Sequence, residues 1–91
     1  MNHRIDEMLE PGSKIGILGG GQLGRMLAVA ATRLGFKSHI FEPAENSPAS
    51  QVSFQVSTAS YEDEKALIEF AKDVDVITYE FENIPTSALD I

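Results

Sequence analysis

The sequence predicts an α/β fold in which parallel strands alternate with crossover helices. Three observations lead to this prediction. Strand-like and helix-like segments alternate along the 91 residues. The first strand-like segment ends in a run of glycines that opens a helix-like segment. Apolar residues follow the helical period of about 3.6 in some segments and form short continuous or alternating runs in the others. A chain of this length has room for one small domain.

The first half of the chain is predicted to form a strand, a helix and a second strand. Residues 14–18 (KIGIL) are a short apolar run, typical of a strand buried on both faces. Residues 22–34 have helical spacing, and Gly35 is expected to end this helix. Residues 37–42 (KSHIFE) are the second strand, closed by Pro43. The apolar face expected on the helix consists of Leu23, Met26, Leu27, Ala30 and Leu34.

The second half continues the alternation. Residues 43–51 have the composition of a loop, and residues 52–56 alternate in polarity like a short third strand. Ser60 followed by Asp63 resembles a capping box, so the acidic residues 62–64 are expected in the first turn of a helix. The apolar face expected on this helix consists of Leu67, Phe70, Ala71 and Val74.

The last part of the chain is predicted to form a fourth strand and the start of a helix. Residues 76–79 are the strand, and Pro85 suits the first turn of the helix. The chain ends at Ile91 when that helix has barely begun. We therefore expect a truncated domain over residues 14–91, preceded by a flexible leader over residues 1–13.

The composition excludes several classes of function. A net charge of −7 argues against binding to nucleic acid or to an anionic membrane, because both require a basic face. The chain has no cysteine, which excludes disulfides and thiolate metal sites. Its apolar runs are too short to cross a bilayer, and its start lacks the apolar centre of a signal peptide. A cytoplasmic protein is expected by default.

A glycine-rich turn is the first candidate binding site. Residues 19–24 (GGGQLG) fit G-x-G-x-x-G between the first strand and the first helix. In such a motif Gly19 permits the tight turn, Gly21 lets a ligand approach the backbone and Gly24 lets helix and sheet pack closely. The helix N-terminus then offers amides and partial positive charge to an anion. Glycines that only form the turn are the alternative.

Two charged residues are secondary candidates beside this turn. Glu42 lies eighteen residues beyond Gly24, at the end of the second strand. In a dinucleotide-binding domain, a carboxylate at this position would hold the ribose hydroxyls. Arg25 follows Gly24 and either reaches an anion at the turn or is solvated.

The end of the fourth strand carries the second candidate site, residues 79–85 (YEFENIP). On an extended segment Glu80 and Glu82 share one side. If the first and fourth strands are neighbours, Glu80 lies beside the glycine turn, where a carboxylate suits a ligand that offers amino or hydroxyl donors. The alternative is a solvated acidic loop in which Asn83 caps the next helix.

The segments 16–27 (GILGGGQLGRML) and 79–85 together resemble N5-carboxyaminoimidazole ribonucleotide synthetase. The resemblance covers residues 14–91. It implies a Rossmann-like, three-layer αβα domain, the pre-ATP-grasp domain, which comes first of three in that family and is shared with biotin carboxylase. The full enzyme is expected to be an ATP-grasp ligase of purine biosynthesis, which activates bicarbonate with ATP and Mg²⁺ and carboxylates the exocyclic amine of aminoimidazole ribonucleotide.

The resemblance also implies which residues bind the ribonucleotide. They lie in the glycine turn and at the end of the fourth strand, and none is expected to act as an acid or base. ATP and Mg²⁺ are expected to bind outside this chain, so the fragment alone is expected to be inactive, and the full enzyme is expected to be a homodimer. The implied ribonucleotide-binding residues are Gly19, Gly20, Gly21, Gln22, Leu23 and Glu80.

Two other functions remain open from the residues alone. One is an NAD(P)-binding domain of an oxidoreductase with Glu42 on the ribose, which the acidic strand end disfavours because carboxylates repel a pyrophosphate. The other is a nucleotide-sensing module with no chemistry of its own. His3 and His39 are interpreted as non-catalytic, with His39 packed or half-exposed in its strand, and no metal site is predicted.

Overall fold

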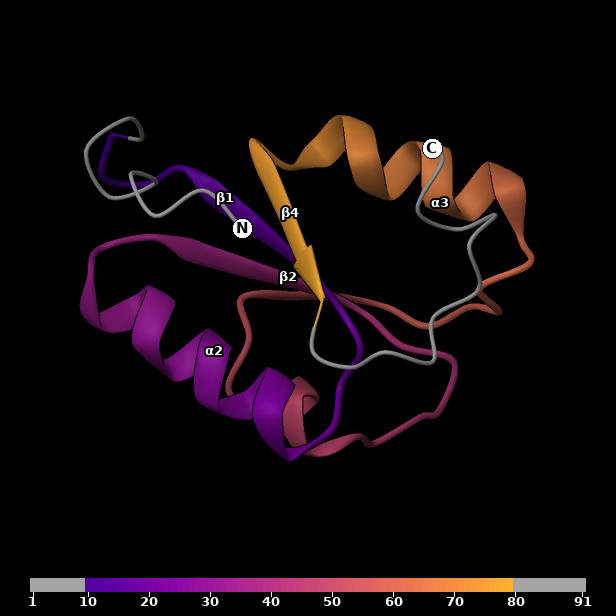
Figure 1. The fold of residues 1–91 in the computed structure, drawn as a ribbon, viewed down its shortest axis with the longest axis horizontal. Helices are drawn as coiled ribbons and strands as arrows, with labels where there is room; N and C mark the ends of the chain where they lie inside the picture. The colour runs from indigo at the N-terminus through magenta and orange to yellow at the C-terminus, as the bar shows by residue number, and fades with distance from the viewer. Residues whose placement is uncertain (1–9, 80–91) are drawn as a thin grey trace.

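The computed structural model describes residues 10–79, which form a parallel sheet with a helix on each face (Figure 1). Strands and helices follow one another in the predicted order, with a short 3₁₀ helix, η1, added in the loop after the second strand. In chain order the elements are β1 (Lys14–Leu18), α2 (Gln22–Arg33), β2 (Lys37–Phe41), η1 (Pro48–Gln51), β3 (Gln55–Ser57), α3 (Glu64–Asp73) and β4 (Val76–Tyr79).

The sheet has four strands in the order β3-β2-β1-β4, and every pair is parallel. In the register, Leu18 of β1 lies opposite Phe41 of β2 and Tyr79 of β4. The carboxyl ends of β1, β2 and β4 therefore meet at one edge of the sheet. The first and fourth strands are neighbours, which is the arrangement that places the end of β4 beside the glycine turn.

Two apolar clusters, one on each face of the sheet, hold the three layers together. Successive side chains of a strand point to opposite faces, so Ile17 and Leu18 belong to different clusters. Figure 1 shows α2 and α3 on opposite sides of the strands, as the predicted αβα architecture requires. The α2 face buries Ile17, Ala28, Ile40 and Ala49. The α3 face buries Leu18, Phe41, Leu67 and Phe70.

The packing face of α2 differs from the predicted one. The helix places small residues against the sheet, namely Gly24, Ala28 and Ala31. On the predicted face, Leu23, Met26 and Leu34 are instead exposed by 48%, 66% and 62%. Small side chains let the helix axis approach the strands. Leu27 of the predicted face still packs against the buried cluster on this side of the sheet, whereas the three exposed residues leave it for the surface. The prediction for α3 is confirmed in its main contacts, because Leu67 and Phe70 are buried.

Two local predictions are wrong in position. The third strand is Gln55–Ser57. It begins later than predicted because η1 extends to Gln51 and the first residue to pair with β2 is Gln55, opposite His39. The cap of α3 is Asp63, whose side chain accepts from the Ala66 amide. Ser60 instead accepts from the Glu62 amide in the preceding turn. Of the acidic residues 62–64, only Glu64 lies in the first turn.

The end of α2 follows the prediction closely. Gly35 has φ 88° and follows the C-cap Leu34. The amide of Gly35 donates to Thr32 O at 3.0 Å, and the amide of Phe36 donates to Ala31 O at 2.9 Å. This pattern closes the helix through a left-handed residue, a conformation that glycine adopts without steric penalty.

Candidate functional site

The glycine turn lies at the carboxyl end of β1 and leads into α2. Gly19 has φ 112°, which a residue with a side chain rarely adopts, and its amide donates to Phe41 O at 2.8 Å. The predicted role of Gly19 in making the tight turn is confirmed. Helix α2 begins after Gly21 with no side-chain cap and no acidic residue in its first turn. Its N-terminal partial charge is therefore not offset by a carboxylate of its own first turn.

The middle glycine of the turn is enclosed by the segment that follows β2. The Gly20 amide donates to Glu42 Oε1 at 2.7 Å, and Gly20 O accepts from the Ala49 amide at 2.9 Å. A Cβ at this position would lie 2.6 Å from Ser47 Oγ and 2.9 Å from Glu42 Cγ. Glycine is required at position 20 because the loop after β2 occupies the space of a side chain.

Glu42 contacts main-chain amides through both carboxylate oxygens. Oε1 accepts from Gly20, and Oε2 accepts from the Ala44 amide at 2.8 Å. A ribose-binding carboxylate would direct these oxygens towards the hydroxyls of the ligand. The observed geometry instead ties the glycine turn to the loop after β2, which disfavours the oxidoreductase interpretation.

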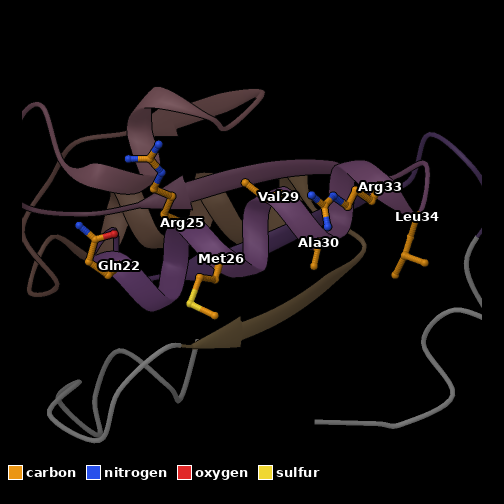
Figure 2. Close-up of a pocket in the computed structure, with 7 residues that line it drawn as sticks. All are labelled: Gln22, Arg25, Met26, Val29, Ala30, Arg33 and Leu34. Atoms are coloured by element: carbon orange, nitrogen blue, oxygen red, sulfur yellow. The ribbon is translucent and has the colours of Figure 1, made fainter.

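Gln22, Leu23 and Arg25 lie in the first turn of α2. Gln22 and Arg25 also line a shallow groove along the outer face of the helix (Figure 2). The groove encloses about 580 Å³ and is lined by Gln22 and Arg25 at one end and by Arg33 and Leu34 at the other. Arg25 Nη1 donates to Gln51 Oε1 at 3.4 Å. This contact links α2 to η1, so the guanidinium is directed to the η1 side of the helix.

The acidic segment after β4 lies largely outside the described residues. Glu80, Glu82 and Asn83 are not among residues 10–79. The pairing of Leu18 with Tyr79 does establish that β4 ends beside the start of the glycine turn. The elements that would carry the two candidate segments are thus neighbours.

His39 is packed, as predicted, but it also has partners that the sequence analysis missed. The residue is only 2% exposed, and its ring packs edge-on to Phe70 with centroids 4.7 Å apart. Nδ1 lies 2.8 Å from Asp73 Oδ2, and Nε2 lies 2.7 Å from Ser57 Oγ. A carboxylate only accepts, so Nδ1 carries the proton and Nε2 of the neutral ring accepts from the hydroxyl.

Burial and hydrogen bonding shift the pKa values of two groups in this network, His39 and Asp73. Burial lowers the pKa of His39 below 6.5, although the hydrogen bond to Asp73 opposes that shift. The hydrogen bond from Lys14 Nζ, at 2.9 Å, lowers the pKa of Asp73 below 3.8. A serine, histidine and aspartate in line can activate a nucleophile. Here the ring is enclosed between β2 and α3, and we assign the network a structural role.

Residues 10–79 contain neither a candidate metal-ion cluster nor a helix that could span a membrane. Within residues 10–79, histidine, cysteine, aspartate and glutamate side chains do not gather in groups of three or more that could hold a metal ion. In the same part of the chain, every helix is too short or too polar to span a membrane.

Comparison with known proteins gives consistent matches over nearly the whole chain. The family model described as the ribonucleotide synthetase preATP-grasp domain matches residues 12–91. A relative from Brucella melitensis, named N5-carboxyaminoimidazole ribonucleotide synthase, is 60% identical over 82 residues, which are 90% of this chain and 23% of the relative.

Solved structures of the same enzyme agree. An ADP complex of N5-carboxyaminoimidazole ribonucleotide synthetase has a TM-score of 0.86 and 50% identity, over 90% of this chain and 22% of that one. An Aspergillus clavatus enzyme in complex with ADP and 5-aminoimidazole ribonucleotide has a TM-score of 0.76 and 43% identity, over 88% and 22%. This chain thus spans less than a quarter of the length of these relatives. With its parallel αβα fold, its glycine turn and a family match over residues 12–91, the chain belongs to the ribonucleotide synthetase pre-ATP-grasp domain family.

Proposed function

We propose that this chain is the ribonucleotide-binding part of an N5-carboxyaminoimidazole ribonucleotide synthetase. The observation that carries the proposal is the position of the glycine turn, between β1 and α2 and beside the end of β4. Ligands of open α/β sheets bind at this edge. The identity to synthetases over 90% of the chain supports the choice of enzyme, and the complex of the Aspergillus clavatus enzyme with 5-aminoimidazole ribonucleotide supports the choice of ligand.

In the proposed complex, the ribonucleotide contacts the turn and the start of α2. The first amides of an α-helix have no acceptor within the helix and carry partial positive charge, which suits the anionic part of a ribonucleotide. Glu80 accepts hydrogen bonds from donors of the same ligand. The contacting residues of the turn are Gly19, Gly20, Gly21, Gln22 and Leu23.

The reaction proposed for the whole enzyme is an ATP-dependent carboxylation in purine biosynthesis. Bicarbonate supplies the carbon. A new N–C bond forms at the exocyclic amine of 5-aminoimidazole ribonucleotide, which loses a proton, and a C–O bond of bicarbonate breaks as its oxygen leaves with the phosphate that ATP releases on becoming ADP. ATP with Mg²⁺ supplies the activation from domains beyond this chain, and the enzyme acts as a cytoplasmic homodimer. The residues of this chain bind and orient the ribonucleotide, and none is assigned a proton-transfer step.

An amide chemical-shift titration of the chain tests the proposal. We expect 5-aminoimidazole ribonucleotide to shift the amides of Gly21, Gln22, Leu23 and Glu80, whereas NAD should not. Shifts with NAD that extend to Glu42 would contradict the proposal and indicate a dinucleotide domain. Absence of shifts with the ribonucleotide would show that this chain alone does not form the site.

A further inference from the structure

We infer that Glu42 is a positioning residue, which holds the glycine turn in its ligand-binding shape and does not itself contact the ligand. This inference rests on the proposed function, because it deepens the role of the same turn. Glu42 lies just beyond β2, which ends at Phe41, and reaches across to Gly20 on the neighbouring β1–α2 connection. The two residues are 22 positions apart in the chain.

The hydrogen bonds of Glu42 are those of a bridge. Oε1 accepts from the Gly20 amide at 2.7 Å, and Oε2 accepts from the Ala44 amide at 2.8 Å. One carboxylate therefore joins the glycine turn to the loop that follows β2. Hydrogen bonds in which the acceptor is ionised are shorter and stronger than neutral ones. The contact to Gly20 is also partly buried, which reduces competition from water.

Two main-chain hydrogen bonds beside this bridge hold the same turn. The amide of Gly19 donates to Phe41 O at 2.8 Å, and the amide of Ala49 donates to Gly20 O at 2.9 Å. Main-chain atoms make both of these contacts, whereas Glu42 uses its side chain. The β-carbon and γ-carbon of Glu42 also cover the Cα of Gly20, since a Cβ there would lie 3.0 and 2.9 Å from them. Glu42 thus restrains Gly20 by hydrogen bonding and by packing.

This restraint acts on the residues that follow. Gly20 directly precedes the N-cap Gly21 and the first turn of α2. If the peptide plane of Gly20 rotated, the amides of Gly21 to Leu23 would change direction. A glycine segment has more conformational freedom than any other, so a side chain that fixes it lowers the ordering required when the ligand binds.

The test compares Glu42→Ala and Glu42→Gln with the control Glu45→Ala. Glu45 is an exposed carboxylate of the same loop, so its removal changes the net charge equally. Glutamine keeps one oxygen that can accept from Gly20. The first readout is amide hydrogen exchange at Gly20 without ligand, with the amides of Ile17 and Ile40 reporting whether the fold is intact. The second is the dissociation constant for 5-aminoimidazole ribonucleotide from the amide shifts.

In Glu42→Ala we expect Gly20 to exchange about tenfold faster or more, as loss of a charged hydrogen bond implies. We expect the ribonucleotide to bind about tenfold more weakly or worse. Glu42→Gln should recover most of both effects, and Glu45→Ala should change neither. If both Glu42 variants lost binding equally while Gly20 exchange stayed unchanged, the carboxylate would contact the ligand and the inference would be wrong.

The two proposals fail in different ways. If the wild-type chain does not bind the ribonucleotide, the proposed function fails for this chain, and Gly20 exchange still decides whether Glu42 holds the turn. If the wild type binds and Glu42→Ala leaves both Gly20 exchange and affinity unchanged, the function stands and the role of Glu42 is refuted. Should Glu42→Ala not fold, Glu42→Gln decides the question. Near-wild-type Gly20 exchange and affinity would support the inference, and lost affinity with unchanged Gly20 exchange would overturn it.

Discussion

Gly16, in the middle of β1, shows how a single hydrogen atom sets the distance between two layers. A Cβ at this position would lie 2.7 Å from Phe70 Cζ and 2.9 Å from Val74 Cγ2. Phe70 is 2% exposed, and its ring also packs against Phe41 with centroids 5.4 Å apart. The aromatic ring therefore occupies the space above the strand that a side chain would otherwise fill, and it is held there from several sides.

Gly16→Ala should destabilise the protein by about 1–3 kcal/mol, because the added methyl group overpacks the α3 face of the sheet. Urea-induced unfolding gives the free energy. The double variant Gly16→Ala/Phe70→Leu should lose less free energy of unfolding than the sum of the losses in the two single variants, because the smaller side chain at position 70 makes room for the methyl group. Gly16→Ala combined with Ile68→Ala should be additive, since Ile68 is 40% exposed on the same helix. Wild-type stability in Gly16→Ala would contradict this account.

At the scale of elements, the start of α3 depends on one side chain. Asp63 Oδ1 accepts from the Ala66 amide at 3.1 Å, and Asp63 is the N-cap. Asp63→Ala should lower the free energy of unfolding by about 1 kcal/mol, because the cap bond and the favourable charge at the helix N-terminus are both lost. Ser60→Ala should have a smaller effect, since its hydroxyl accepts from Glu62 ahead of the helix. If Ser60→Ala lowered the free energy of unfolding more than Asp63→Ala does, measured by denaturant unfolding, Ser60 would be the cap as the capping box predicted.

The elements also differ in how well local pattern predicts them. In α3, the spacing of Leu67 and Phe70 identified the buried face, since the largest apolar residues are the ones that pack. In α2, the same argument selected a mostly exposed face, of which Leu27 packs against the core, because the fully buried residues of this helix are Gly24, Ala28 and Ala31. Periodicity marks a helix in both cases, but the side that packs is decided by the space left between helix and strands.

At the scale of the whole molecule, one polar network joins four elements. Lys14 of β1 and His39 of β2 both contact Asp73 at the end of α3, and His39 also contacts Ser57 of β3. Each contact spans at least 18 positions of the chain. The network therefore forms only when the strands and α3 are assembled, and its protonation is linked to global stability.

Acidification below pH 6.5 should lower the free energy of unfolding. Burial depresses the pKa of His39 in the folded protein below 6.5, so the unfolded chain takes up the proton first. The stability from a neutral His39 is present above pH 6.5 and is lost as the pH falls from there through the folded-state pKa. Asp73, with its pKa held below 3.8 by Lys14, adds a further loss at more acidic pH.

Urea unfolding of wild type and His39→Gln between pH 7.5 and 5 measures the effect of His39. The variant should be less stable at neutral pH and should show a weaker dependence on pH, because glutamine does not titrate. The difference between the two stability profiles isolates the contribution of His39 from that of the other titratable groups. Identical profiles would mean that His39 titrates alike in the folded and unfolded states.

The sequence by itself determined the order of the strands and helices, the glycine turn and the family resemblance. These features depend on residues that are close together in the chain, because they are encoded by the period of apolar residues and by the positions of glycine and proline. Only the tertiary structure decided which face of α2 packs, that Glu42 holds Gly20 and that His39 meets Asp73. Those partners lie 22 and 34 positions apart, and each could form other contacts in another fold. The physical reason is that a side chain's partner depends on which distant segment the sheet brings beside it.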